Sequence, residues 1–239
     1  MKLKSLISSV CLLALSHTAS AGIIDADSVL LDDAGATQLE SWLGLGDLDW
    51  DSIWYGEIGN NASTSQSWHE AVDGVGPTVS IYSVTNYLNE QVLIGGYTEQ
   101  DWSGSGYRYD SNAFLFNLST GEMQTHRYSD GSNAIYTNSG YFATFGGGHD
   151  LTAHSAGNVF YTFSYTYDIT QGRIDVFGDS GSAYGGVGSF MDNTVHSLQT
   201  FTFSTAGPSV PSTDVPEPSS LAIFAAGLLG LLRIRAKKA

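Results

Sequence analysis

Several stretches of this chain alternate a large aromatic or aliphatic residue with a small polar one. In the clearest of them, aromatic residues stand at every second position from Tyr161 to Tyr167, with Thr or Ser between them. A period of two places one set of side chains toward a core and the other toward solvent, as in a half-buried strand. Turns rich in Gly, Asn and Ser separate further candidate strands, at residues 78–85, 92–97, 113–118, 141–145, 173–177 and 198–204. Many short strands with few helices predict a mostly β chain, an antiparallel two-sheet β-sandwich with a few short helices at its edges.

One helix is predicted early in the chain. The aspartates at residues 32–33 can cap its first turn, and Gly44 can end it. Leu39, Trp42 and Leu43 follow the i, i+3, i+4 spacing of a single helix face. We therefore expect a short amphipathic helix that packs this face against the sandwich.

The charged residues are unevenly distributed. The chain has 9 Lys+Arg and 24 Asp+Glu, and all the acidic residues lie between Asp25 and Glu217. The basic residues gather at the two ends. The body of the chain between these ends has 24 acidic residues and three basic ones, Arg108, Arg127 and Arg173, which gives it a formal charge of −21. Because nucleic-acid binders need basic residues to neutralise phosphates, this charge argues against nucleic acid as a partner, and it disfavours an anionic membrane surface.

The first 21 residues have the pattern of a secretory signal peptide. Lys2 and Lys4 form a basic start, and an apolar stretch that can form the signal helix follows at residues 6–15. The small residues Ala19 and Ala21 fit cleavage after Ala21. The single cysteine of the chain lies within the signal segment, so the mature protein is expected to have neither a disulfide nor a thiolate metal site.

The last 25 residues combine a proline motif, an apolar run and a basic end. The motif is Pro216-Glu217-Pro218, the run covers residues 221–232, and the basic end includes Arg233 and Arg235. A stable transmembrane helix needs about 20 apolar residues, so this shorter run predicts a short hydrophobic helix that pauses in the membrane. The alternative interpretation is a plain membrane anchor.

This tail resembles the PEP-CTERM sorting tail of Gram-negative bacteria. The resemblance implies recognition by an exosortase-type membrane protease, transient anchoring in the inner membrane, and removal of the tail. It also implies delivery to the cell surface or to an exopolysaccharide matrix. A Ser/Pro linker precedes the tail, so the predicted organisation is a signal peptide (1–21), one domain (22–208), a linker (209–214) and the tail (215–239).

Within the domain, five short motifs follow one another in an order that resembles the TLDc family. The similarity extends over residues 28–205. The motifs are Trp68-His69, then Asp73-Gly74-Val75-Gly76-Pro77, then Gly95-Gly96-Tyr97 with Trp102 nearby, then a strand with Phe114 and Phe116, and finally Gly146-Gly147-Gly148. The resemblance implies a TLDc-like two-sheet β-sandwich and no agreed catalytic residues. Eukaryotic members are tied to oxidative-stress resistance and to the vacuolar proton pump, roles that a shared fold alone does not transfer.

Three acidic residues form the first candidate site. Asp47, Asp49 and Asp51 begin like a calcium-binding EF-hand loop, but Ser52 and Ile58 replace the glycine and glutamate that such a loop needs. The strongly acidic body favours divalent cations, so a weak calcium site is one hypothesis. The other is a strand or turn whose acids face water. No other cofactor is expected.

Two histidines form the second candidate site. His149, Asp150 and His154 follow a run of glycines, and imidazole and carboxylate groups can bind a metal. Their spacing differs from the i, i+4 helical pair of a zinc protease, so we favour a structural turn.

The third candidate is the Trp68-His69 pair. His69 is interpreted either as a general base or as a histidine hydrogen-bonded to a loop carbonyl, and we favour the second because no serine elbow motif accompanies it. In the Asp73–Pro77 motif, Gly74 is expected to adopt positive φ, and Pro77 fixes φ for the strand that follows.

Sugar binding is the last candidate chemistry. Exposed aromatic rings beside acids and amides bind sugars by stacking and hydrogen bonding. Trp102 is the tryptophan that we would choose as a ligand contact, against the alternative that it belongs to the core.

These observations predict an exported, non-catalytic surface or matrix protein that binds exopolysaccharide or has a structural role. The alternative is a polysaccharide hydrolase that uses a pair of carboxylates. A role in oxidative stress has less support, because the mature chain has no cysteine and no haem or flavin motif.

Overall fold

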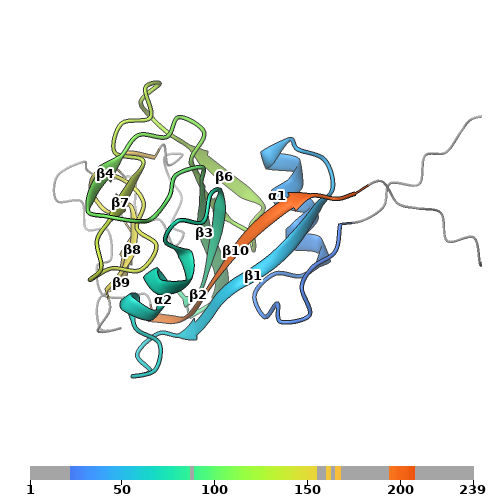
Figure 1. Cartoon of the computed structure of the whole chain (residues 1–239), viewed down its shortest axis with the longest axis horizontal. Helices are drawn as coiled ribbons and strands as arrows, with labels where there is room; N and C mark the ends of the chain where they lie inside the picture. Colours follow the sequence, from blue (N-terminus) through green and yellow to red (C-terminus); the bar gives the residue numbers. More distant parts are fainter. Residues whose placement is uncertain (1–21, 87–88, 155–159, 163–164, 168–193, 208–239) are drawn as a thin grey trace, which may run out of the picture. The chain divides into compact units, whose positions relative to one another are not determined.

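The computed structural model of the chain describes residues 22–86, 89–154, 160–162, 165–167 and 194–207 (Figure 1). These residues form two helices, α1 (Asp33–Leu43) and α2 (Ser65–Val72), and ten strands. The larger sheet has the strand order β1-β10-β2-β3-β5-β6, and all neighbours in it are antiparallel. Its strands are β1 (Leu48–Glu57), β2 (Thr78–Thr85), β3 (Gln91–Thr98), β5 (Phe114–Asn117), β6 (Glu122–Thr125) and β10 (Thr194–Thr205).

The second sheet consists of two antiparallel strand pairs, β4 with β7 and β8 with β9. These strands are β4 (Gly106–Arg108), β7 (Ile135–Thr137), β8 (Leu151–Ala153) and β9 (Phe160–Thr162). Bridges from Phe145 to both Ile135 and Leu151 link the two pairs. The prediction of a mostly β, antiparallel two-sheet sandwich with few helices is therefore confirmed.

The larger sheet has a hydrophobic cluster on each face. Along β2, Tyr82 and Val84 belong to the cluster between the two sheets, where α2 contributes Trp68. Val79 and Ile81 alternate with them and belong to the opposite cluster, which α1 covers. Figure 1 shows α1 and the second sheet on opposite sides of the larger sheet. Both faces of the central strands are thus buried, and polar side chains within them pair in the interior, as Ser80 of β2 does with Thr200 of β10.

The early helix was predicted correctly. The Asp32 side chain accepts a hydrogen bond from the Gly35 N–H and caps α1, while Gly44 ends the helix in the left-handed conformation with φ 68°. The second helix, α2, was not predicted. Its signals are a capping box formed by Thr64 and Ser67 and an i, i+4 apolar pair that is buried in the core.

The strand predictions agree with the sheet at its centre. Residues 78–85 are β2, and the segments 92–97, 113–118 and 198–204 overlap β3, β5 and β10. Residues 141–145 make isolated bridges instead of a named strand. In the alternating segment 161–167, β9 covers residues 160–162 and Tyr167 bridges His126. Residues 173–177 lie outside the described residues.

A buried glutamine ties the N-terminal segment to the last strand. Gln199 of β10 accepts hydrogen bonds from the Val29 and Leu30 N–H groups through Oε1, at 2.9 and 2.8 Å. Its Nε2 donates to the Asp27 carbonyl and to Ser52 Oγ. All the polar atoms of this side chain are therefore used, and each bond holds a segment distant in sequence.

Candidate functional site

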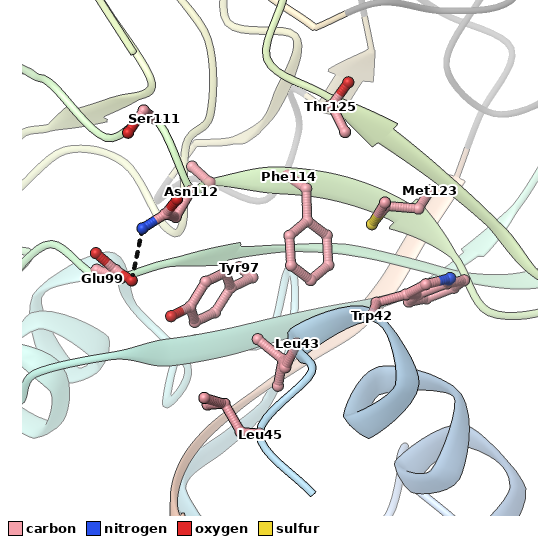
Figure 2. Close-up of a pocket in the computed structure, with 11 residues that line it drawn as sticks. Trp42, Leu43, Leu45, Tyr97, Glu99, Ser111, Asn112, Phe114, Met123 and Thr125 are labelled. Carbon is pink, nitrogen blue, oxygen red and sulfur yellow. Dashed lines mark hydrogen bonds between the residues drawn. The ribbon is translucent and has the colours of Figure 1, made fainter. Parts of the chain in front are cut away.

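An open groove of about 470 Å³ lies on the α1 face of the larger sheet (Figure 2). Its walls are Trp42, from the end of α1, and the rings of Tyr97 and Phe114, from β3 and β5. Leu45 and Met123 add aliphatic surface, with 50% and 38% of each residue exposed. The volume falls within the ~300–1,000 Å³ typical of ligand sites.

Polar groups line one end of this groove. Asn112 Nδ2 donates to Glu99 Oε1 at 2.9 Å, and both residues are exposed (Figure 2). Burial, aided by the nearby Glu99 and Asp110 carboxylates, raises the pKa of Tyr97 well above its ordinary value. Its hydroxyl therefore stays protonated and can donate as well as accept a hydrogen bond.

A buried carboxylate holds this polar end in place. Asp110 Oδ2 accepts from Thr98 Oγ1 and from the Glu99 N–H, both at 2.7 Å. Its Oδ1 accepts from the Asn112 N–H at 3.0 Å. Asp110 thus fixes the backbone of both rim residues, at the end of β3 and just before β5.

The groove contains one carboxylate among its lining residues, that of Glu99. A second groove of about 400 Å³, beside the start of α1, is also lined by one, Asp32, which already caps that helix. Glycosidases use two carboxyl groups roughly 5–10 Å apart, and among the described residues each of these grooves is lined by one.

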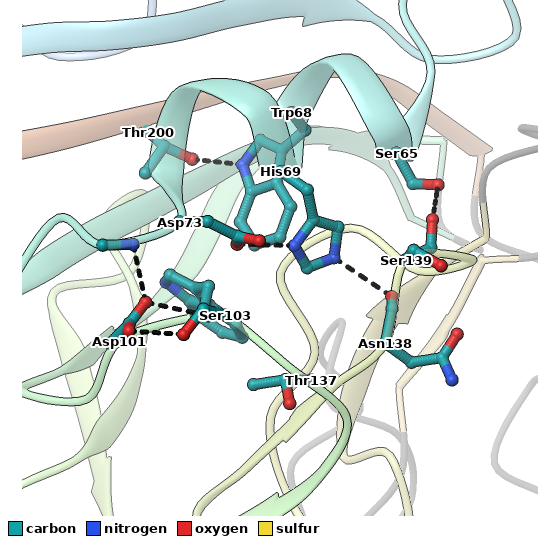
Figure 3. Close-up of polar contacts among 12 residues, drawn as sticks. Ser65, Trp68, His69, Asp73, Asp101, Ser103, Thr137, Asn138, Ser139 and Thr200 are labelled. Atoms are coloured by element: carbon teal, nitrogen blue, oxygen red, sulfur yellow. Dashed lines mark hydrogen bonds and ion pairs between the residues drawn. The ribbon is translucent and has the colours of Figure 1, made fainter.

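The predicted Trp68-His69 pair lies on α2 (Figure 3). His69 is buried, and its Nε2 donates to the Asn138 carbonyl oxygen at 3.0 Å. Its Nδ1 lies 2.7 Å from Asp73 Oδ1. Ser65, one helical turn earlier, donates to the Ser139 carbonyl. This geometry matches the structural interpretation, because Nε2 ties α2 to the loop after β7 and Nδ1 contacts Asp73 at the C-terminal cap of the same helix.

The turn after α2 is held by a second carboxylate (Figure 3). Asp101 Oδ1 accepts from the Gly74 and Ser103 N–H groups, both at 2.8 Å. Although its partial burial opposes the shift, these bonds and the Ser103 hydroxyl hold the pKa of Asp101 below its ordinary value. Gly74 has φ 78°, as the turn prediction required. Gly76 and Pro77 complete the turn at the surface, just before β2.

Trp102 does not present its ring to a ligand, so the expected contact was wrong. Its side chain is fully buried, and its indole N–H donates to Thr78 Oγ1 at 2.9 Å. The ring packs edge-on against Trp68 and Phe145. The flanking Asp101-Trp102-Ser103 sequence resembles an exposed loop, but the tertiary packing draws the ring inward.

The three aspartates of the calcium hypothesis lie at the start of β1. Asp49 Oδ1 accepts from the Ile23 N–H, Asp51 is exposed, and Leu48 and Trp50 point to the core between them. Same-face residues of a strand are about 7 Å apart, which is wide for the ligand shell of a single ion. Over the ranges that the structure describes, no group of three His, Cys, Asp or Glu side chains could hold a metal, and this includes any group with Asp47.

The two histidines of the second candidate site both pack on Tyr141, with ring centroids 5.3 Å (His149) and 4.2 Å (His154) away. Burial lowers the pKa of both, and the neighbouring His154 lowers that of His149 further. The Asp150 carboxylate does not join the two histidines in a common ligand set. Its Oδ2 accepts from the backbone N–H groups of residues 165–167, so it serves the turn.

The remaining motif glycines provide close packing. A Cβ on Gly95 would overlap Ser80 O and the Phe116 ring, and one on Gly96 would lie 2.6 Å from the Phe145 ring. Phe114 and Phe116 are buried on the α1 side. The last motif forms the turn before Asp150: Gly146 has φ 88°, the Gly147 N–H donates to Thr166 Oγ1, and Gly148 is half-buried.

Several predicted positions lie outside the described residues. These are the cleavage-site residues Ala19 and Ala21, the sorting residues Pro216, Glu217, Pro218, Arg233 and Arg235, and the hydrophobic helices expected at both ends. Across the described part of the chain, no helix is both long enough and apolar enough to span a membrane.

Sequence reasoning did not single out the groove. Trp42 was recognised as part of a helix face, but Glu99, Asn112 and Met123 come from separate segments and share no motif. The available signal was the exposed Leu45 directly after the helix-ending glycine, next to an aromatic helix face.

Comparison with protein families identified both parts of the chain. A PEP-CTERM protein-sorting motif matches residues 214–238, so the chain is an exosortase-sorted surface protein. The comparison with curated proteins found no match. A TLDc domain matches residues 25–210, which is most of the sequence, and the described fold is the sandwich that this resemblance implied. The chain belongs to the TLDc domain family.

Proposed function

We propose that this chain is a non-catalytic binding module that acts outside the cell. In this proposal the signal peptide directs export, and an exosortase system of a Gram-negative bacterium then places the module at the cell surface or in the matrix. There the TLDc domain binds exopolysaccharide. The sorting motif supports the surface destination, while the binding role rests on the TLDc domain itself.

The observation that carries the binding role is the aromatic groove beside α1. It combines ring and aliphatic surface with hydrogen-bonding groups, as saccharide-binding sites do. It has one carboxylate, whereas hydrolysis of a glycosidic bond needs an acid and a second carboxylate. The groove thus favours binding over the alternative of a hydrolase.

The charge of the body fits the same role. With 24 acids and three arginines, the module stays soluble at high local concentration, because like charges repel and suppress aggregation. It can also associate with a matrix in which divalent cations bridge acidic groups.

The test is size-exclusion chromatography with light scattering on the host's own exopolysaccharide, with and without the protein. The full chain, expressed from residue 1, is purified in a detergent without a sugar headgroup. We expect the protein to co-elute with polymer of unchanged mass. A polymer mass that falls with time would show a hydrolase instead, and separate elution of protein and polymer would contradict the proposal.

A further inference from the structure

We infer that the groove beside α1 takes a short segment of a neutral saccharide chain. This inference rests on the proposed binding function and names the site and the ligand class. The structure supports it through three independent features: the apolar walls, the polar rim and the charge around them. Each restricts the class of molecule that fits.

The walls favour a ligand with apolar faces of about the size of a sugar ring. Trp42 is half-buried, and it meets the Phe114 ring edge-on with centroids 6.3 Å apart. Leu45 and Met123 leave further apolar surface open to solvent. A pyranose ring presents C–H groups on its faces, and these pack on aromatic and aliphatic side chains.

The rim favours a ligand rich in hydroxyl groups. Glu99 can only accept hydrogen bonds, Asn112 can donate and accept, and the protonated Tyr97 hydroxyl can do both. Ser111 and Thr125 add two more hydroxyls to the lining. Adjacent sugar hydroxyls match such a mixed set, whereas the alkyl chain of a lipid would leave it without partners.

The charge excludes anionic sugars. Glu99 and the buried Asp110 lie together at the polar end, and the lining, as far as the structure describes it, contains no Lys or Arg. A uronic acid or a sulfated sugar would therefore bring a negative charge next to Glu99 with no cation to pair it. A neutral chain avoids this repulsion while keeping every hydrogen bond.

The site is also held in shape before any ligand binds. Asp110 fixes the backbone of both rim residues, and α1 is capped at both ends, which positions Trp42. A preformed site loses little conformational freedom on binding, so even a shallow groove can bind usefully.

The test uses the full chain in the same sugar-free detergent and two sets of probes. The neutral probes are linear hexasaccharides of glucose, xylose and N-acetylglucosamine, and the anionic probes are oligogalacturonate and oligoguluronate. Binding is measured by isothermal titration calorimetry and by tryptophan fluorescence. We expect at least one neutral probe to bind about tenfold more tightly than either anionic probe.

Trp42 provides a signal specific to the groove. Trp50, Trp68 and Trp102 are at most 1% exposed, and the half-buried Trp54 packs against the cluster on the opposite face of the larger sheet. A ligand in the groove should therefore perturb mainly the fluorescence of Trp42. Trp42→Phe keeps an aromatic wall and removes this fluorophore. The expected result is retained heat of binding with a much smaller fluorescence change.

Rim variants complete the test. Asn112→Ala should weaken neutral-probe binding about tenfold, and Glu99→Gln should reduce the difference in affinity between neutral and anionic probes. Tyr109→Ala is the control, because Tyr109 is 65% exposed and does not line the groove. Thermal melting checks that each variant folds.

The outcomes separate the two claims. If the wild-type chain co-elutes with the host polymer but the rim variants bind it equally well, the groove is the wrong site and the proposed function stands. If neutral and anionic probes bind alike, the ligand class is wrong. If the chain binds no saccharide or polymer at all, both the groove inference and the proposed function fail.

Discussion

Among the single residues, Asp150 is expected to make the stability of the turn before β8 depend on pH. Its carboxyl group is buried, Oδ2 accepts three backbone N–H groups, and Oδ1 has no hydrogen-bond partner within the described residues. Burial outweighs the three hydrogen bonds and raises the pKa of Asp150 to about 6. A proton on this carboxyl group belongs on Oδ1, since Oδ2 is already occupied.

We expect this group to make the fold less stable as pH rises. The folded pKa exceeds the unfolded value of 3.8, so the folded state binds the proton more strongly between these pH values. The free energy of unfolding of the wild type, relative to Asp150→Asn, should fall by about 2 kcal/mol between pH 4 and pH 7. Urea titrations across this range check it, and a constant difference between the two proteins would refute the assignment.

Gly74 tests the backbone conformation of the turn after α2. Its φ of 78° is unfavourable for a β-branched residue, while the space around its Cα is open. Gly74→Val should therefore cost about 2 kcal/mol and lower the melting temperature by roughly 4–8 °C. Gly74→Asn should cost less, because asparagine tolerates this conformation. Equal melting temperatures for all three proteins in a calorimetric scan would contradict the positive φ assigned to Gly74 in this turn.

The packing of one element on another depends on the Gly95-Gly96 pair of β3. The Gly96 position faces the second sheet and is filled by the Phe145 ring. Gly96→Ala should destabilise the domain by about 3 kcal/mol through overpacking. Gly76→Ala is the control, because the space there is empty. Adding Phe145→Leu should recover part of the loss, and strictly additive unfolding energies would show that the two positions do not touch.

The elements differ in how far local sequence determines them. α1 and β2 could be predicted because caps and alternation lie within the segment itself. α2 was missed because five of its eight residues are polar and its capping box lacks the usual Glu or Gln. The burial of Trp102 depends on Thr78 and Trp68, which are distant in sequence, so no local pattern reveals it.

For the molecule as a whole, Gln199 joins the two ends of the domain. Replacing it with Leu removes four hydrogen bonds and leaves the Val29 and Leu30 N–H groups without their acceptor. Gln199→Leu should cost about 3 kcal/mol and increase amide hydrogen exchange over residues 27–31. Gln66→Leu, at an exposed site on α2, is the matched control. Unchanged exchange in that segment would show that other contacts hold it.

The family, the sandwich and the sorting motif could all be recognised in the sequence, since each depends on short ordered motifs. The groove could not, because it forms where α1, β3, β5 and β6 meet. Its rim also depends on Asp110, whose buried contacts are visible only in three dimensions.

The strand order has a consequence for how the protein reaches its destination. β10 comes last among the described strands, yet it lies between β1 and β2. Before residues 194–205 are available, β1 and β2 lack the strand that hydrogen-bonds to both of them. The larger sheet therefore cannot be completed until residues 194–205 are available to pair. In the export that we propose, the domain is therefore expected to stay unfolded until nearly all of it has crossed the membrane.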